Sequence, residues 1–330
     1  MNIEQLHQKD ANNLNNPDWG MPSFLKKAGV IGVFLAAMGS SGEFKESQVE
    51  ASAIETKTAE KLKVNEITLE EEIAKLDNGM MTDQEERMVV AIKRGVKWKF
   101  IESGGNNKSA NAMPPQQVSE LITGGADQVE LIHTHPLASC PYSDSLKADI
   151  RSGKVKALPN PPSLDYDIML ASVTYAVHLG EQYQKIKSKV IDPTGVWEFT
   201  LDNKHPFVGK IKNYITDLEK GYLSAEEMAL VKKEGIDLDK LNPQELLGAL
   251  QNNPNTSKFA DRLLANQQTA SKAWISTITE KEMMGFDEAV YAAQNIINPL
   301  KDPKNISQRI EKFIAACKEL GIIISYQPKK

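Results

Sequence analysis

The chain has 330 residues, of which 41% are hydrophobic and 25% are charged, so it can form a packed core and is not disordered as a whole. Its net charge of −5 argues against a broad basic surface for nucleic acid. Only two cysteines and five histidines occur, which excludes a disulfide scaffold, a four-cysteine iron–sulfur cluster and a cysteine-rich structural zinc site.

The first 79 residues form an N-terminal segment with one apolar stretch. A charge-free run at 28–39 follows two lysines and is followed by small residues, so 26–41 has the pattern of a secretory signal. The run is shorter than the roughly 20 residues that a transmembrane helix needs. A buried or amphipathic helix explains it equally well, which leaves cytoplasmic and exported locations open. The charged stretch at 43–75 indicates an exposed helix or a linker.

Hydrophobic periodicity predicts an α/β domain over 80–204. The expected elements, in chain order, are strands over 86–93 and 96–101, a helix over 115–122, a strand over 128–135, a helix that begins at Ser163 and a hairpin over 189–199. Residues 205–305 have the pattern of a wholly helical block, and 306–330 supply a closing helix and strand. We therefore predict a mixed sheet flanked by helices, with the helical block inserted before the last two elements.

His133 and His135 alternate on the strand over 128–135, so their side chains project from the same face. Two such imidazoles can bind one metal ion if a third ligand approaches from elsewhere. The scarcity of cysteine favours a carboxylate as that ligand. Three aspartates follow a serine downstream, and each can also be explained by ordinary helix capping. These candidates are Asp149, Asp165 and Asp167.

The run from Glu86 to Ile168 resembles the JAB/MPN (JAMM) metalloprotease family, and in layout it is most similar to the RadC-like bacterial branch. The resemblance rests on Glu86, Ser103-Gly104-Gly105, the segment 113–118, Gly125-Ala126-Asp127 and Leu131-Ile132-His133-Thr134-His135-Pro136. It spans 80–204, and the closing helix and strand at 306–328 are assigned to the same domain. It implies the JAB/MPN fold, with layers like those of cytidine deaminase.

The resemblance also implies the roles of individual residues. His133, His135 and Asp167 would hold one zinc ion per chain, and Glu86 would carry protons to and from a water molecule. Ser163 would polarise the substrate carbonyl.

Two departures from the family pattern concern the last two residues. The family serine lies eight residues after the second histidine, where Ser143 stands here, but Leu146 occupies the expected aspartate position. Choosing Ser163 requires an insertion at 137–161, and three residues rather than two separate Ser163 from Asp167. Asp165 and Asp149 therefore stay as alternatives.

The resulting hypothesis is a zinc-dependent metallopeptidase or isopeptidase that acts on a polypeptide, with ubiquitin-like or other protein conjugates among the candidate substrates. An inactive JAB/MPN-like interaction module is the alternative. A RadC-like DNA-associated role ranks lower because the net negative charge of the chain argues against a nucleic-acid partner. A thiol hydrolase at Cys140 is conceivable because histidines lie near it in sequence, but strand geometry does not favour it, and an ordinary loop cysteine is the preferred interpretation. No transmembrane helix is expected, and the sequence leaves the oligomeric state open.

Overall fold

The computed structural model describes residues 68–103, 113, 115–236, 243–298 and 303–329. The signal-like run at 28–39 and the two glycines at 104–105 lie outside these residues. Within the described ranges, no helix combines the length and the apolar character that a membrane span requires.

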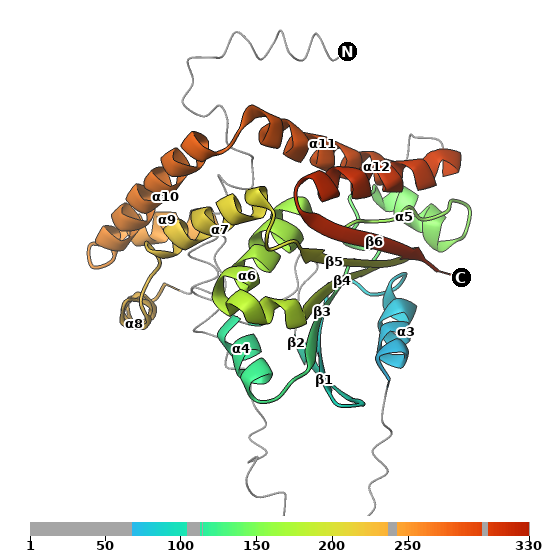
Figure 1. Ribbon diagram of the computed structural model, residues 1–330, viewed down its shortest axis with the longest axis horizontal. Coiled ribbons are helices and arrows are strands. Elements are labelled where there is room, and N and C mark those ends of the chain that lie inside the picture. The colour runs from blue at the N-terminus through green and yellow to red at the C-terminus, as the bar shows by residue number, and fades with distance from the viewer. Residues whose placement is uncertain (1–67, 104–112, 114, 237–242, 299–302, 330) are drawn as a thin grey trace, which may run out of the picture.

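A mixed sheet of six strands forms the centre of the protein (Figure 1). Its order is β2–β1–β3–β4–β5–β6; β3 and β4 are parallel, whereas the other neighbouring pairs are antiparallel. The strands are β1 (Met88–Arg94), β2 (Lys97–Ser103), β3 (Gln128–Thr134), β4 (Ile186–Asp192), β5 (Gly195–Leu201) and β6 (Ile322–Pro328). The predicted α/β class with a mixed sheet is confirmed, and the C-terminal strand joins the sheet beside β5.

Helices flank this sheet on both faces, with α3 on one side and α4 and α6 on the other (Figure 1). The α-helices are α3 (Leu69–Gly79), α4 (Pro115–Thr123), α5 (Asp144–Arg151), α6 (Val173–Leu179), α7 (Pro206–Glu219), α8 (Ala225–Lys233), α9 (Pro243–Asn252), α10 (Ser257–Thr277), α11 (Glu280–Ile296) and α12 (Ile306–Glu319). The π-helix η1 (Leu164–Ser172) precedes α6, and the 3₁₀-helices are η2 (Gly180–Lys185) and η3 (Pro303–Asn305).

Two hydrophobic layers cover the two faces of the sheet. Val90 belongs to the main core, which also contains Ile168 of η1. Its neighbour Val89 points the other way and packs with Ile132 and with Leu76 of α3. Burial of both faces explains why the sequence of β1 is a continuous apolar run rather than an alternating one. It also shows that α3 is not wholly exposed, which the charged composition of this segment did not indicate.

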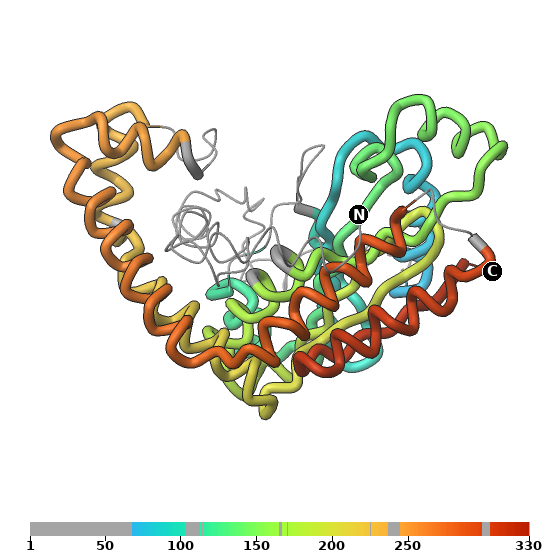
Figure 2. Tube along the Cα trace, turned by 90° about the horizontal axis from the view of Figure 1, so that it is seen from above, coloured from blue at the N-terminus to red at the C-terminus, as the bar shows by residue number. Residues whose placement is uncertain are grey.

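The helices between β5 and β6 contribute to two separate cores. The main core includes side chains of α7, the C-terminal half of α10, and α11. A second core joins α8, α9 and the start of α10, and contains Val231, Leu246, Leu250 and Phe259. Figure 2 shows α10 running away from the sheet with α8 and α9 at its far end. The helical content predicted for 205–305 is therefore present in its described residues, and the insertion itself stays a prediction.

An ion pair between Arg262 of α10 and Glu227 of α8 joins these two helices. Arg262 Nη1 and Nη2 donate to Oε1 and Oε2 of Glu227 at 2.7 and 2.6 Å. Glu227 also forms a capping box with Ser224 at the start of α8, as the sequence predicts. The hydrogen bonds from Arg262 lower the pKa of the Glu227 carboxyl to about 2.

Glu227→Gln is expected to destabilise the second core by about 1 kcal/mol at pH 7, because the pair is partly exposed and screened. The Glu227 carboxylate stabilises the fold above its ordinary pKa of 4.5, and that contribution is lost as the pH falls toward 2. Hydrogen exchange of the α9 amides should therefore rise in the variant at pH 7 and converge with wild type near pH 2. Glu226→Gln, on the exposed face of α8, is the control. Equal exchange of Glu227→Gln and wild type at pH 7 would contradict this account.

Candidate metal centre

The ends of β1 and β3 bring Glu86 and the two histidines together. His133 lies opposite Met88 in the antiparallel register, and the chain just before β1 passes beside the end of β3. Thr134 extends this pairing: its hydroxyl accepts the Arg87 N–H at 2.8 Å, and its own N–H donates to Arg87 O at 3.0 Å. Glu86, immediately before Arg87, is thereby held on the side of the sheet that carries His133 and His135.

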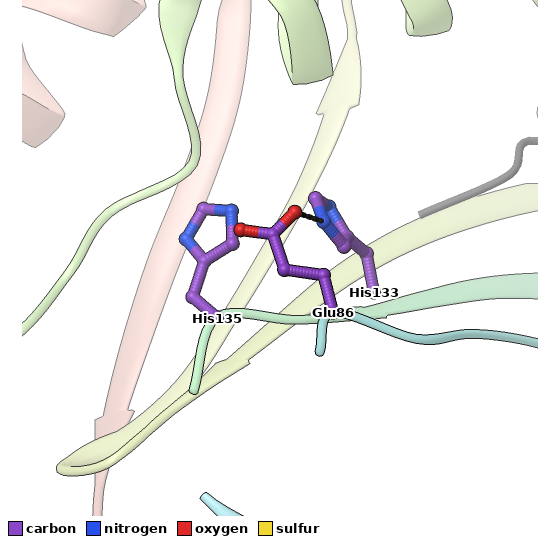
Figure 3. A group of neighbouring side chains, drawn as sticks. All are labelled: Glu86, His133 and His135. Atoms are coloured by element: carbon purple, nitrogen blue, oxygen red, sulfur yellow. Dashed lines mark hydrogen bonds and ion pairs between the residues drawn. The ribbon is translucent and has the colours of Figure 1, made fainter. Parts of the chain in front are cut away.

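Glu86, His133 and His135 form a group that could hold a metal ion. One ligand atom from each residue lies within 4.8 Å of the other two. Oε2 of Glu86 is 3.2 Å from Nε2 of His133, and the imidazole rings stand nearly perpendicular with centroids 4.7 Å apart. Figure 3 shows the Glu86 carboxylate between the two rings. Glu86 and His135 are buried, and His133 is only partly exposed.

Asp167, from the π-helix η1, contacts both imidazoles. Its Oδ1 lies 3.2 Å from Nδ1 of His133, and its Oδ2 lies 3.6 Å from Nε2 of His135. Two ligands bound at 2.0–2.1 Å to a tetrahedral ion are roughly 3.4 Å apart. Each of the two contacts is close to that separation, but they involve different oxygens of Asp167, and the group whose ligand atoms all lie within 4.8 Å of one another consists of Glu86, His133 and His135.

The π-helix explains how Asp167 reaches this position with three residues between it and Ser163. The amides of Asp167 and Ile168 both donate to Ser163 O at 3.2 Å, the second being the i→i+5 bond of a π-helix. Ser163 N–H donates to Asp167 Oδ2 at 2.6 Å, and Asp167 N–H donates to Ser163 Oγ at 3.2 Å. This reciprocal pair resembles a capping box with one extra residue. Sequence periodicity indicated an ordinary helix here, and the wider turn is what accommodates the additional residue.

The ring of His133 lies between two carboxylates, so a metal ion could bind on either side of it. Nδ1 faces Asp167 and Nε2 faces Glu86. One ring nitrogen can bind a given ion while the other, which carries the proton, donates a hydrogen bond. The ion would therefore bind either on the Asp167 side, with Glu86 in the outer shell, or on the Glu86 side, with Asp167 in the outer shell.

The electrostatics of the cluster favour a cation. Burial opposes protonation of His133, but Asp167 and Glu86 outweigh it and raise its pKa to about 10. Burial and the positive charge of His133 lower the pKa of His135. Although burial opposes ionisation of Asp167, the two histidines and the Ser163 N–H hold its pKa well below the usual range. The potential that stabilises a proton on His133 would also stabilise a metal ion at the same place.

The backbone around Asn160 and Ile191 fixes His135. Nδ1 of the ring lies 3.4 Å from Asn160 O, and the backbone N–H of His135 donates to Ile191 O at 2.8 Å. A carbonyl and a carboxylate can only accept, so a proton on Nδ1 is donated to Asn160 O and a proton on Nε2 is donated to Asp167. No sequence pattern indicates a role for Asn160, because its contact with the ring is made by a backbone atom.

The alternative ligands Asp149 and Asp165 are not shown in contact with the histidines. Asp149 lies on α5, and its Oδ1 pairs with Lys154 Nζ at 3.0 Å. Among the described residues, no hydrogen bond or ion pair joins Asp149 to either histidine. The side chain of Asp165 lies outside the described part of the chain. Ser143 serves as the N-cap of α5.

Cys140 does not have the environment of a nucleophile. The thiol is buried and donates to Pro136 O at 3.7 Å. Burial raises its pKa to about 12, so the thiolate is not populated near neutral pH. This agrees with the sequence-based preference for an ordinary loop cysteine.

Similarity to known proteins does not identify this centre. No family model, no curated protein and no solved structure matches the chain. The chemistry of the centre is therefore inferred from its own side chains: two imidazoles, two carboxylates and one serine near the ends of β1 and β3.

Proposed function

We propose that the protein is a zinc-dependent metallopeptidase or isopeptidase of the JAB/MPN type, with the helical block at 205–305 inserted into that fold. The observation that carries the proposal is the contact of one partly buried carboxylate, Asp167, with both imidazoles, with a second carboxylate on the far side of His133. The sequence resemblance assigns the same residues to the same roles.

Asp167 is the better third ligand, and Glu86 the better proton carrier. A catalytic zinc site keeps three protein ligands and one open position. Asp167 has ion-pair contacts with both histidines, so it can complete a set of three with them. Glu86 is then left as the second carboxylate of the cluster, on the Nε2 side of His133, and a carboxylate can accept a proton and return it.

The reaction class follows from these positions. When bound in such a site, zinc supplies Lewis acidity, which polarises a carbonyl group and makes water nucleophilic near pH 7. Glu86 would take a proton from the attacking water and deliver it to the amine that leaves. A serine hydroxyl has one donor and two acceptor lone pairs, so Ser163 can accept from Asp167 N–H and donate to the substrate carbonyl oxygen.

Metal analysis of the purified full-length protein tests this proposal. Wild type should retain about one equivalent of zinc after dialysis, and the double variant His133→Ala/His135→Ala should retain none. His178→Ala is the control, because that ring pairs with Glu219 Oε1 at 2.7 Å and lies outside the cluster. A wild-type protein that never retains zinc would refute the proposal. Retention of zinc without cleavage of any peptide or conjugate would instead favour the inactive interaction module.

A further inference from the structure

The proposed chemistry does not use one buried carboxylate at the end of β4. Asp192 is fully buried and accepts five hydrogen bonds. Its Oδ1 accepts from the N–H and the hydroxyl of Thr194, both at 2.6 Å, and from Gly195 N–H at 2.9 Å. Its Oδ2 accepts from Trp197 Nε1 at 2.8 Å and from Asn160 N–H at 2.7 Å. Such bonding offsets the large cost of burying a carboxylate.

Four of these bonds close the β4–β5 hairpin, and the fifth reaches a distant segment. Asn160 stands 32 residues before Asp192, in the connection between α5 and η1. Its backbone N–H is bound by Asp192, and its carbonyl lies 3.4 Å from Nδ1 of His135. The same short segment therefore joins Asp192 to a proposed metal ligand.

Ile191, the residue before Asp192, also forms a hydrogen bond with His135. Ile191 O accepts the backbone N–H of His135 at 2.8 Å. Both the backbone and the ring of His135 thus depend on groups at the end of β4. A carbonyl beside Nδ1 selects the tautomer whose Nε2 can bind a metal, and such outer-shell partners affect metal affinity by about 10–100-fold.

We propose that Asp192 is a positioning residue for the metal centre. By binding the amide of Asn160, it places the Asn160 carbonyl against His135, and that carbonyl favours the Nδ1–H tautomer over donation from Nε2 to Asp167. Zinc affinity is the part of this inference that rests on the proposed function. The tautomer of His135 is a property of the metal-free protein and can be measured separately.

Two variants at Asn160 test the hydrogen bond that its backbone N–H donates to Asp192 Oδ2. Asn160 stands between two prolines, so its backbone is already restricted to extended conformations that proline itself adopts. Asn160→Ala keeps the N–H and the carbonyl and loses the side-chain contact with Cys140 Sγ, whereas Asn160→Pro also replaces the N–H with a ring carbon that points at Asp192 Oδ2. Asp192→Asn places an amide nitrogen among donors, and Thr194→Val removes one donor to Oδ1 while leaving Oδ2 and Asn160 in place. If Asp192→Asn does not fold, the comparison of Asn160→Ala with Asn160→Pro still tests whether Asp192 positions the Asn160 segment.

Zinc affinity, measured by competition with a chromophoric chelator, should fall about 10–100-fold in Asn160→Pro and Asp192→Asn. It should change by less than about twofold in Asn160→Ala and Thr194→Val, since neither variant removes the Asn160 amide or carbonyl.

In the metal-free protein, ring ¹⁵N chemical shifts of His135 should report the Nδ1–H tautomer in wild type and Asn160→Ala, and a mixture in Asn160→Pro. An unchanged tautomer and unchanged affinity in Asn160→Pro would overturn the inference. If wild type binds no zinc, the proposed function fails, and the tautomer comparison still decides the role of Asp192.

Discussion

Replacing Glu86 with glutamine is expected to lower peptide hydrolysis by about 10²–10⁴-fold while zinc stays bound, because a proton-transfer group typically contributes that much. Glutamine has the shape of glutamate, and its carbonyl oxygen can keep the hydrogen bond to His133 Nε2, which is 3.2 Å in the wild-type protein. An amide cannot take up and release a proton near neutral pH. The loss should therefore appear in kcat, with zinc content close to one equivalent.

The matched control for this variant is Glu85→Gln. Glu85 precedes Glu86 and is exposed, so its replacement removes the same charge without touching the cluster. Cleavage of a peptide library should be as fast in Glu85→Gln as in wild type. If Glu86→Gln loses zinc, Glu86 is a ligand and the metal occupies the Glu86 side of His133. If Glu86→Gln cleaves at the wild-type rate, Glu86 carries no proton.

Replacing Asp167 with asparagine is expected to weaken zinc binding by more than about 100-fold, since loss of an outer-shell partner alone costs 10–100-fold. The variant keeps an oxygen that can accept from Ser163 N–H, a bond of 2.6 Å in wild type, so the start of η1 should persist. It loses the charge that both histidines contact. Zinc affinity measured by chelator competition, with hydrogen exchange of η1 to confirm its folding, would separate loss of the ligand from loss of the helix.

Asp149→Asn and Asp165→Asn test the other two aspartates in the same assay. Asp149 is paired with Lys154 on α5, so its replacement should leave zinc affinity unchanged. Weakened binding in Asp165→Asn with normal binding in Asp167→Asn would move the third ligand to Asp165.

Much of the sheet could be predicted from the sequence because its signals are local. The alternating strand at 96–101, the hairpin around Asp192 and Gly195, and the last strand are all present in the sheet. The histidine pair was also predictable, since residues two apart on a strand share a face. The partner of β6 was less certain from periodicity alone, because pairing across more than one hundred residues leaves no local pattern.

The rest of the centre depends on non-local or backbone contacts. The width of the helix after Ser163 is set by hydrogen bonds to Ser163 O, and periodicity does not separate a π-helix from an α-helix over one or two turns. Asn160 acts through its carbonyl, which every residue type has. The role of Thr134 between the histidines becomes visible only when β3 pairs with the chain before β1.

We expect one zinc ion to bind between His133, His135 and Asp167. Anomalous diffraction at the zinc edge from crystals of the zinc-loaded protein can locate this ion. We expect one peak within about 2.2 Å of a ring nitrogen of each histidine and of an Asp167 oxygen, with Glu86 outside that distance. A peak coordinated by Glu86 and not by Asp167, or no peak at this cluster, would show that zinc does not bind in this way.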